Sequence, residues 1–206
     1  KKLGTTSKGI APCYADKMAR TGQLARDVLP PDLLWDEKLN GRILCEGAQG
    51  YYLDVDQGNY PYVTSSTTLP YGACSLGFPP QKIRHIWGIS KIYDTRSGVD
   101  PLFPKNLQKD KDLAKLGDLG QEFGVTTGRR RTCNWLNLDM MLDAAKNTGT
   151  THLVINKCDI IRQLGIFRCY HGNDLVTFST YDEMTEFITS QVSKSKTLIK
   201  HVYLSN

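Results

Sequence analysis

The chain has 206 residues, of which 40% are hydrophobic and 23% are charged, with 26 Lys and Arg against 21 Asp and Glu. This composition is typical of a soluble globular protein and excludes disordered, collagen-like and coiled-coil chains. The formal net charge of +5 suits a protein that handles small anions, and is too small by itself to predict a nucleic-acid partner.

In chain order, the first half is predicted to hold a helix, a connector and a strand. Tyr14–Arg20 has the pattern of a short helix after a loop of small residues. Gly22–Asn40, which two adjacent prolines interrupt, is expected to be a connector with a helical turn at Leu33–Lys38. Arg42–Glu46 (RILCE) is a β-rich run that ends in a glycine-flanked turn, which in α/β folds presents ligand groups at a sheet edge.

The second half alternates strands with helices. Lys82–Tyr93 alternates apolar with polar residues, which predicts a central strand, and Thr95–Leu119 is expected to be a long surface excursion. The remaining predicted elements are a helix over Trp135–Lys146 with Asn134 as N-cap, a buried strand over Thr151–Ile155, a helix over Tyr181–Ser193 and a final strand over Ile199–Leu204. The predicted fold class is α/β, in a single domain over residues 1–206.

Cysteine spacing and hydropathy indicate where the protein acts. The six cysteines form no C-x-x-C pair and no Cys/His cluster with zinc spacing, so we expect reduced, mostly buried thiols, a cytoplasmic location and no metal site in this chain. No apolar run approaches the roughly 20 residues of a membrane-spanning helix, so no membrane partner is expected. The sequence begins at Lys1 without Met, and we expect that an N-terminal segment is missing.

The motif Asn156-Lys157-Cys158-Asp159 directly follows the strand predicted over Thr151–Ile155. A carboxylate in that position can accept both N1–H and N2–H of guanine, a pair of donors that adenine does not offer. The lysine stem can cover the base, and the asparagine can brace the loop. Chance alone gives N-K-x-D in roughly one chain in fifty of this length. The motif therefore indicates guanine recognition, with a capped structural turn as the alternative.

Gly124–Arg131 (GVTTGRRR) places two hydroxyl groups and three guanidinium groups on a glycine-flanked loop. Because arginine offers a bidentate fork to carboxylates and phosphates, this loop is a candidate anion clamp. The alternatives are a solvated basic loop and a nucleic-acid patch.

Two hydroxyl-rich runs and one glutamine are weaker candidates for ligand binding. The hydroxyl-rich runs Thr5-Thr6 and Thr64–Thr68 could bind a phosphate, although such runs are also common in structural turns. Gln49 lies between glycines after the predicted strand, where its amide could contact an oxo group of a ligand or serve the fold alone. The four histidines show no metal-binding spacing, and a standard P-loop motif is absent.

Together these segments resemble adenylosuccinate synthetases. The similarity lies in the stretches Thr5–Lys17 (TTSKGIAPCYADK), Glu46–Ser66 (EGAQGYYLDVDQGNYPYVTSS), Glu122–Thr132 (EFGVTTGRRRT) and the Lys-x-Asp turn, which occur in the family's order. The resemblance implies an α/β fold related to P-loop NTPases, with a central, mostly parallel sheet flanked by helices and with long ligand-binding loops. It also implies a carbon–nitrogen ligase that joins L-aspartate to C6 of a purine nucleotide, with Mg²⁺ and with GTP or ATP as phosphate donor.

The resemblance further implies roles for individual residues. The residues implied to bind the 5′-monophosphate are Thr5, Thr6, Gln49, Thr64 and, across a homodimer interface, Arg20. Gln49 would also stabilise charge that develops at the 6-oxo group, which is a catalytic role. The residues implied to bind aspartate are Val125, Thr126, Thr127, Arg129 and Arg131. The residues implied to face the base of the triphosphate are Asn156, Lys157, Asp159 and Ser205.

Departures from the family pattern bear on completeness and substrate. The family's Gly-Asp-Glu-Gly-Lys-Gly loop, with the catalytic Asp, the Mg²⁺ site and a catalytic His, is not in this sequence, so we expect a longer chain. Ser7-Lys8, Gln57 and Leu69-Pro70-Tyr71 differ from the usual residues, and the connector is short. This plan is similar to a phage-encoded branch that condenses aspartate with dGMP for 2-aminoadenine DNA, which would place the protein in host cytoplasm. IMP with GTP is the alternative.

Two other function classes remain open. One is a nucleotide-binding module without catalysis, which would bind GTP tightly and turn nothing over. The other is an RNA-binding protein that uses Arg129–Arg131, with an affinity that falls steeply with salt. We expect the ligase, with small-molecule substrates and no nucleic-acid partner.

Overall fold

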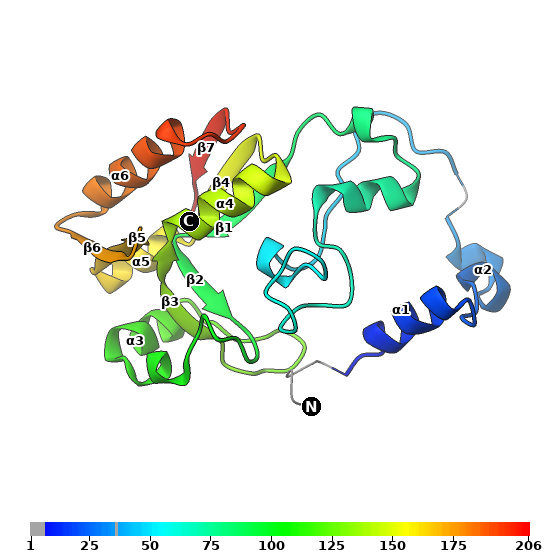
Figure 1. Ribbon diagram of the computed structural model, residues 1–206, viewed down its shortest axis with the longest axis horizontal. Coiled ribbons are helices and arrows are strands. Elements are labelled where there is room, and N and C mark those ends of the chain that lie inside the picture. The colour runs from blue at the N-terminus through cyan, green and yellow to red at the C-terminus, as the bar shows by residue number, and fades with distance from the viewer. Residues whose placement is uncertain (1–6, 36) are drawn as a thin grey trace. The chain divides into compact units, whose positions relative to one another are not determined.

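The computed structural model describes residues 7–35 and 37–206 (Figure 1). The chain divides into two compact units, which we call the N-terminal unit (Ser7–Gly77) and the C-terminal unit (Phe78–Asn206). The expectation that residues 1–206 form one domain stays a prediction. Among the described residues, no helix combines the length and apolar character that crossing a membrane would require.

The C-terminal unit contains two sheets, and the first of them is parallel. It contains β1 (Trp87–Lys91), β4 (His152–Asn156) and β7 (His201–Leu204) in the order β1-β4-β7, and both strand pairs are parallel. Alternate residues of β4 point into the core, where Leu153 and Ile155 are buried. This sheet places the carboxyl ends of β4 and β7 side by side.

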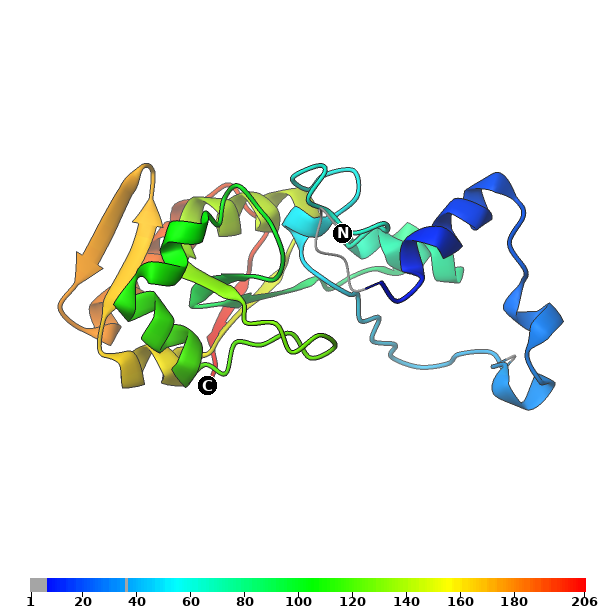
Figure 2. The same cartoon turned by 90° about the horizontal axis from the view of Figure 1, so that it is seen from below.

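The second sheet of the C-terminal unit is mixed. Its strands, in the order β2-β3-β5-β6, are β2 (Tyr93–Arg96), β3 (Thr132–Asn137), β5 (Phe167–His171) and β6 (Asp174–Phe178). β3 and β5 are parallel, whereas β2-β3 and β5-β6 are antiparallel pairs. Only Ile92 separates β1 from β2, so the chain passes directly from one sheet into the other. Figure 2 shows the β5-β6 hairpin, yellow to orange, at one end of this unit.

Helices flank both sheets, which confirms the α/β class. They are α3 (Lys111–Leu119), α4 (Leu138–Thr148), α5 (Cys158–Leu164) and α6 (Tyr181–Lys194), with short 3₁₀ helices at Pro80–Lys82 and Lys105–Lys109. α3 packs on β3 and α5, and α6 packs on β5 and β6. The fully buried side chains of the core include Leu116, Leu136, Leu138, Ile155, Ile161, Met184 and Ile188.

The N-terminal unit contains only short helices and loops among its described residues. Its elements are α1 (Ile10–Ala19), α2 (Ala25–Val28) and 3₁₀ helices at Pro31–Leu33, Tyr51–Leu53 and Pro70–Leu76. The strand predicted at Arg42–Glu46 is wrong, because this segment is irregular and exposed. Leu44 is 84% exposed, and no neighbouring strand in the described part of the unit supplies a hydrogen-bonding partner.

Several boundaries in the C-terminal unit also differ from prediction. The central strand expected over Lys82–Tyr93 is shorter, because β1 covers only Trp87–Lys91. It is also an edge strand and not a central one, since among the described strands β1 pairs with β4 alone. Asn134 lies inside β3, and Asn137 caps α4 instead by accepting the N–H of Met140 at 3.0 Å. The predicted surface excursion contains α3, whose Leu113 and Leu116 are buried.

The other elements match or extend the prediction. β4, α6 and β7 confirm the predicted Thr151–Ile155 strand, Tyr181–Ser193 helix and final strand, and α1 covers most of the first predicted helix. All six cysteines are free thiols, and three of them, Cys133, Cys158 and Cys169, are buried. Cys13 and Cys45 are exposed, so burial of the thiols holds for the C-terminal unit only.

One buried carboxylate organises a loop of the N-terminal unit. Asp54 is fully buried, and its Oδ1 accepts the N–H groups of Asp56 and Gln57 at 2.9 and 3.0 Å. Its Oδ2 accepts the hydroxyl of Thr67 at 3.0 Å and the N–H of Thr68 at 2.6 Å. Burial alone would raise the pKa of Asp54, but these hydrogen bonds outweigh it and lower the pKa below the ordinary value.

Asp54→Asn is expected to reduce the free energy of unfolding by about 2–4 kcal/mol at pH 7, because an amide places donors against donors. The folded-state pKa lies below the unfolded value, so this stabilisation is present above the ordinary value of 3.8 and is lost as pH falls through the folded value. Urea unfolding of wild type and variant at several pH values checks this. Asp56→Asn, at an exposed neighbour, should match wild type, and equal stability of Asp54→Asn at pH 7 would contradict the prediction.

Candidate functional site

The motif Asn156-Lys157-Cys158-Asp159 joins β4 directly to α5. Lys157 alone lies between the two elements, with a left-handed backbone (φ 64°) that is uncommon for a residue other than glycine. The N–H of Cys158 donates to the carbonyl of Ser205 at 3.0 Å, and the N–H of Ser205 donates to the carbonyl of Ile155 at 2.9 Å. The four residues predicted to face a base therefore lie together at the carboxyl ends of β4 and β7, where open α/β sheets bind ligands.

Two buried acceptors of this motif find no donor within residues 7–35 and 37–206. Oδ1 of Asn156 and Oδ1 of Asp159 are buried, and neither has a hydrogen-bond partner among the described residues. An unsatisfied buried acceptor costs about 1–3 kcal/mol, so a ligand that carries N–H groups would relieve this cost. Lys157 Nζ donates to the carbonyl of Gly120 at 3.2 Å, which ties the motif to the turn that precedes the Arg-rich loop.

The Arg-rich loop folds as a hairpin closed by backbone hydrogen bonds. The N–H of Arg131 donates to the carbonyl of Glu122 at 2.9 Å, and the N–H of Gly124 donates to the carbonyl of Arg129 at 2.8 Å. At the tip, Gly128 has a left-handed backbone (φ 64°), and its N–H donates to the carbonyl of Gly124 at 2.7 Å. In Figure 2 this light green loop extends away from the green helix α3.

The residues predicted to bind aspartate all belong to this hairpin. Val125, Thr126 and Thr127 form its tip, and Val125 is 98% exposed. Arg129 is exposed, whereas Arg131 is partly buried at the base of the loop. The structure thus brings the predicted hydroxyl and guanidinium groups onto one short loop of the C-terminal unit.

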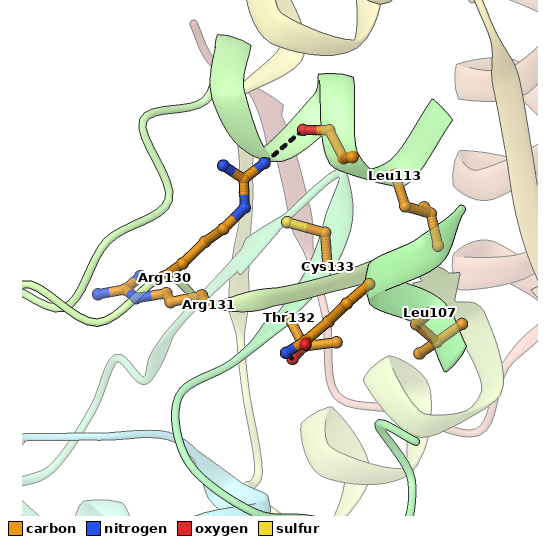
Figure 3. Close-up of a pocket in the computed structure, with 8 residues that line it drawn as sticks. Leu107, Leu113, Arg130, Arg131, Thr132 and Cys133 are labelled. Carbon is orange, nitrogen blue, oxygen red and sulfur yellow. Dashed lines mark hydrogen bonds between the residues drawn. The ribbon is translucent and has the colours of Figure 1, made fainter. Parts of the chain in front are cut away.

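Arg130 has a different role from its two neighbours. Its guanidinium pairs with Asp118 and donates through Nη2 to the carbonyl of Ala114 at 2.7 Å, which fastens the loop to α3. Figure 3 shows Arg130 directed toward α3 and Arg131 directed the other way. The adjacent pocket of about 260 Å³ is lined by Leu107, Gln108, Leu113, Ala114, Arg130, Arg131, Thr132 and Cys133. Gln108 and Thr132 bond to each other there at 2.9 Å, and we assign the pocket no ligand.

A buried polar cluster at the base of the hairpin was not predicted as part of the site. Glu122 is 3% exposed, and its carboxylate accepts hydrogen bonds from Lys91 Nζ at 2.7 Å and Tyr93 Oη at 2.7 Å. Arg131 Nη1 lies 3.2 Å from the same carboxylate. Burial would raise the pKa of Glu122, but these donors lower it below the ordinary value. The only signal in the sequence was the acidic residue of Glu-Phe-Gly at the start of the loop. Its partners could not be identified from it, because they lie 29 and 31 residues earlier in the chain.

A second carboxylate near the cluster titrates close to neutral pH. Burial raises the pKa of Asp94 to about 7, although the N–H of Asn137 at 2.8 Å and the charge of Lys91 act against this rise. Since the folded-state pKa exceeds the ordinary 3.8, the folded protein binds the proton more tightly, and stability falls as pH rises from about 4 to about 7.

We therefore expect the unfolding free energy of wild type to fall by about 2–3 kcal/mol between pH 5 and pH 8. In Asp94→Asn this fall should be absent, because the side chain no longer titrates. Urea unfolding at both pH values measures the loss. Asp174→Asn, at an exposed position in β6, should keep the wild-type profile, and an unchanged profile in Asp94→Asn would contradict the assignment.

The residues predicted to bind the monophosphate lie in the N-terminal unit or outside the described residues. Gln49 has a left-handed backbone (φ 61°), and the adjacent carbonyl of Gly50 accepts the hydroxyl of Thr68 at 3.1 Å. The N–H of Thr64 donates to the carbonyl of Leu53 at 2.8 Å. Gln49 and Thr64 therefore belong to the one loop that Asp54 organises.

Arg20 and the first threonines are placed differently. Arg20 lies on another element, where it caps the carboxyl end of α1 with φ 62°. Thr5 and Thr6 lie outside the described residues. Within residues 7–35 and 37–206, no group of three or more His, Cys, Asp or Glu side chains is arranged to hold a metal ion.

The comparisons with known proteins agree with this fold. The family model of adenylosuccinate synthetase matches residues 33–186. The curated adenylosuccinate synthetase of Thermodesulfovibrio yellowstonii is 38% identical over 214 residues, covering 78% of this chain and 50% of the relative. The solved structure of fully ligated adenylosuccinate synthetase from Plasmodium falciparum has a TM-score of 0.68 and 26% identity, covering 90% of this chain and 57% of that chain.

The chain is thus an α/β protein with one parallel and one mixed sheet. It belongs to the adenylosuccinate synthetase family, a family of carbon–nitrogen ligases, and the predicted family and fold are confirmed. It spans about half the length of the curated relatives it matches. The structure of cyanophage S-2L succinoaminodeoxyadenylate synthetase (PurZ), bound to dGMP and dATP, has a TM-score of 0.42 and 20% identity, covering 71% of this chain and 49% of that chain, and carries no argument about the nucleotide.

Proposed function

We propose that the protein is a ligase that joins L-aspartate to C6 of a purine nucleoside monophosphate. A nucleoside triphosphate phosphorylates the 6-oxygen, and the aspartate amine then forms the C6–N bond as the C6–O bond to the phosphate breaks. Family membership supports this reaction class. The observation that carries the proposal is the junction of β4 and α5. There Asn156 and Asp159, beside Ser205, present buried acceptors for which the described part of the chain supplies no donor.

The phosphate donor we propose is GTP, with ATP as the alternative. Asp159 can accept two N–H groups from guanine, and the amino group of adenine cannot satisfy both positions. The anchored position of Lys157, whose Nζ reaches Gly120, supports a stem that lies along the base. If the loop keeps these residues but has no preference for guanine, ATP would be the donor.

For aspartate, we propose the tip and base of the Arg-rich hairpin. Thr126, Thr127 and the amide near Val125 would donate to a carboxylate, and Arg129 and Arg131 would supply guanidinium forks. The fastening of Arg130 to α3 supports this division, because it anchors the loop through a residue other than the two arginines proposed to bind aspartate. The exposed tip gives a small dicarboxylate access from solvent.

The monophosphate would be held by Thr5, Thr6, Gln49 and Thr64, with Arg20 contributed across a homodimer interface. The amide of Gln49 would stabilise negative charge at the 6-oxygen while phosphate is transferred. Mg²⁺, the cofactor we propose with the triphosphate, would neutralise phosphate charge when bound. The described residues offer no acidic cluster that fits it, so no step is assigned through the ion.

Two monophosphates are candidates for the substrate. The relatives named adenylosuccinate synthetase support IMP, the 6-oxo precursor of that product. The departures at Gln57 and Leu69-Pro70-Tyr71 support dGMP, with a 2-amino group to accommodate and a role in phage purine synthesis. We propose a cytoplasmic location in either case, in the host cell if the gene is carried by a phage.

Gln49→Ala is expected to lower kcat about 100-fold while the affinity for the monophosphate falls less than about fivefold, because the contact strengthens as charge builds at the 6-oxygen. Steady-state kinetics together with calorimetric titration of the monophosphate separate these two effects. Asp56→Asn, at an exposed position of the same loop, serves as the control. A loss of monophosphate affinity with kcat unchanged would contradict the catalytic role and would assign Gln49 to ground-state binding only.

Phosphate release by the complete gene product tests the proposal. We expect release only when L-aspartate, Mg²⁺, a triphosphate and the correct monophosphate are all present. Parallel assays with IMP and dGMP, each with GTP and with ATP, identify both nucleotides. Tight GTP binding without turnover would support a non-catalytic nucleotide-binding module, and inactivity with every combination would overturn the ligase proposal.

A further inference from the structure

Glu122 lies at the meeting point of the two binding segments of the C-terminal unit. Its backbone carbonyl closes the Arg-rich hairpin by accepting the N–H of Arg131 at 2.9 Å, and its carboxylate contacts the guanidinium of the same residue. We propose that Glu122 is a positioning residue that fixes the Arg131 guanidinium for a dicarboxylate ligand of the hairpin. This proposal rests on the proposed function for the identity of the ligand.

The carboxylate of Glu122 is fully engaged by basic and hydroxyl donors. Lys91 Nζ lies 2.7 Å from both oxygens, Tyr93 Oη lies 2.7 Å from Oε1, and Arg131 Nη1 lies 3.2 Å from Oε2. Lys91 is the last residue of β1 in the parallel sheet and Tyr93 is the first residue of β2 in the mixed sheet, so the acid is held by the two sheets rather than by the loop. Arg131 is thereby fastened to a rigid part of the fold through Glu122.

Glu122 uses only part of the Arg131 guanidinium. Lys91 and Arg131 both contact the carboxylate of Glu122, and the charge of Lys91 also acts on the nearby Asp94. Only Nη1 of Arg131 contacts Glu122, and its Nε is buried with no hydrogen-bond partner among the described residues. A guanidinium has five N–H donors in a fixed plane, so an Arg131 held at one corner can present others to a ligand carboxylate.

The turn before Glu122 links this cluster to the base-binding motif. The carbonyl of Gly120 accepts Lys157 Nζ at 3.2 Å, and the N–H of Glu122 donates to the carbonyl of Gly117 at 2.9 Å. A side chain at Gly120 would collide with the hydroxyl of Tyr93, so only glycine lets Tyr93 reach Glu122. The same turn therefore supports Arg131 on one side and Lys157 on the other.

The side-chain Nε–H signal of Arg131, observed by NMR in the ligand-free chain and assigned by its loss in Arg131→Leu, tests the positioning role directly. We expect slow solvent exchange of this proton in wild type, exchange at least tenfold faster in Glu122→Gln, and wild-type exchange in Glu186→Gln, an exposed matched control. Tyr93→Phe, which removes one donor to Glu122 and keeps its charge, should speed exchange severalfold. This variant decides the question if Glu122→Gln does not fold. Wild-type exchange in a folded Glu122→Gln, or in Tyr93→Phe if Glu122→Gln does not fold, overturns the proposal.

Titration with L-aspartate then tests the ligand. Glu122→Gln should weaken binding at least tenfold, and the double variant with Arg131→Leu should bind no more weakly than Arg131→Leu alone, because Glu122 acts through Arg131. Two independent losses that add in the double variant overturn the positioning role. If wild type binds no L-aspartate, the proposed function of the hairpin fails, while the exchange of the Arg131 proton still decides the role of Glu122.

Discussion

Asp159→Asn is expected to weaken GTP binding by about 100-fold or more. The carboxylate can accept both N1–H and N2–H of guanine, and each charge-assisted hydrogen bond is worth about 1.5–3 kcal/mol. Asparagine keeps one acceptor and turns a donor toward the amino group of guanine. Because Asp159 Oδ1 is buried without a partner among the described residues, the variant leaves the contacts within the chain largely unchanged. Calorimetric titration of the chain with GTP measures the loss.

A change of nucleotide provides the sharpest control for this variant. Xanthine carries an oxygen where guanine carries its 2-amino group, so the asparagine amide can donate to it, and binding of xanthosine triphosphate should rise in Asp159→Asn. Asp174→Asn, at an exposed position, should bind GTP as wild type does. If wild type binds GTP and ATP equally, or if Asp159→Asn keeps wild-type GTP affinity, then the motif does not read guanine.

Arg129→Leu is expected to raise the KM for L-aspartate by about 30- to 100-fold with little change in kcat. A bidentate pair of guanidinium and carboxylate contributes about 2–3 kcal/mol, and its loss in both the bound and the transition state appears in KM. Arg129 lies exposed beside the hairpin tip, so its replacement should leave the unfolding free energy almost unchanged. Steady-state kinetics of the complete gene product with varied L-aspartate measure the effect.

The adjacent arginine offers a contrasting variant. Arg130 pairs with Asp118 and with the carbonyl of Ala114, so Arg130→Leu should loosen the hairpin and lower stability. Arg84→Leu, an exposed change ahead of β1, should alter neither KM nor stability. An unchanged KM for aspartate in Arg129→Leu would remove Arg129 from the aspartate site.

The parts of the site that were predictable from the sequence are local. Asn156–Asp159 is a contiguous motif after a strong strand pattern, and the hairpin Gly124–Arg131 is marked by its glycines. The structure places both segments as local patterns indicated, at a strand end and on a loop. Ser205 joins the first segment through β7, which the apolar run near the end of the chain predicted.

The parts that were missed depend on contacts between distant segments. Lys91 and Tyr93 reach Glu122 from strands about thirty residues earlier, and no local pattern pairs them. Arg42–Glu46 shows the opposite error, since a high β propensity forms no strand without a neighbour to bond to. The β5-β6 hairpin had a readable signal in Gly172-Asn173, a two-residue turn between alternating strands.

A crystal structure of the chain with GTP is the most direct test of the claim that β4, α5 and β7 together form a guanine site. We predict that the Watson–Crick edge of guanine lies within hydrogen-bond distance of the Asp159 carboxylate, with the Lys157 stem over the base and Ser205 beside it. A guanine bound elsewhere on the chain, with Asp159 still lacking a donor, would contradict the account.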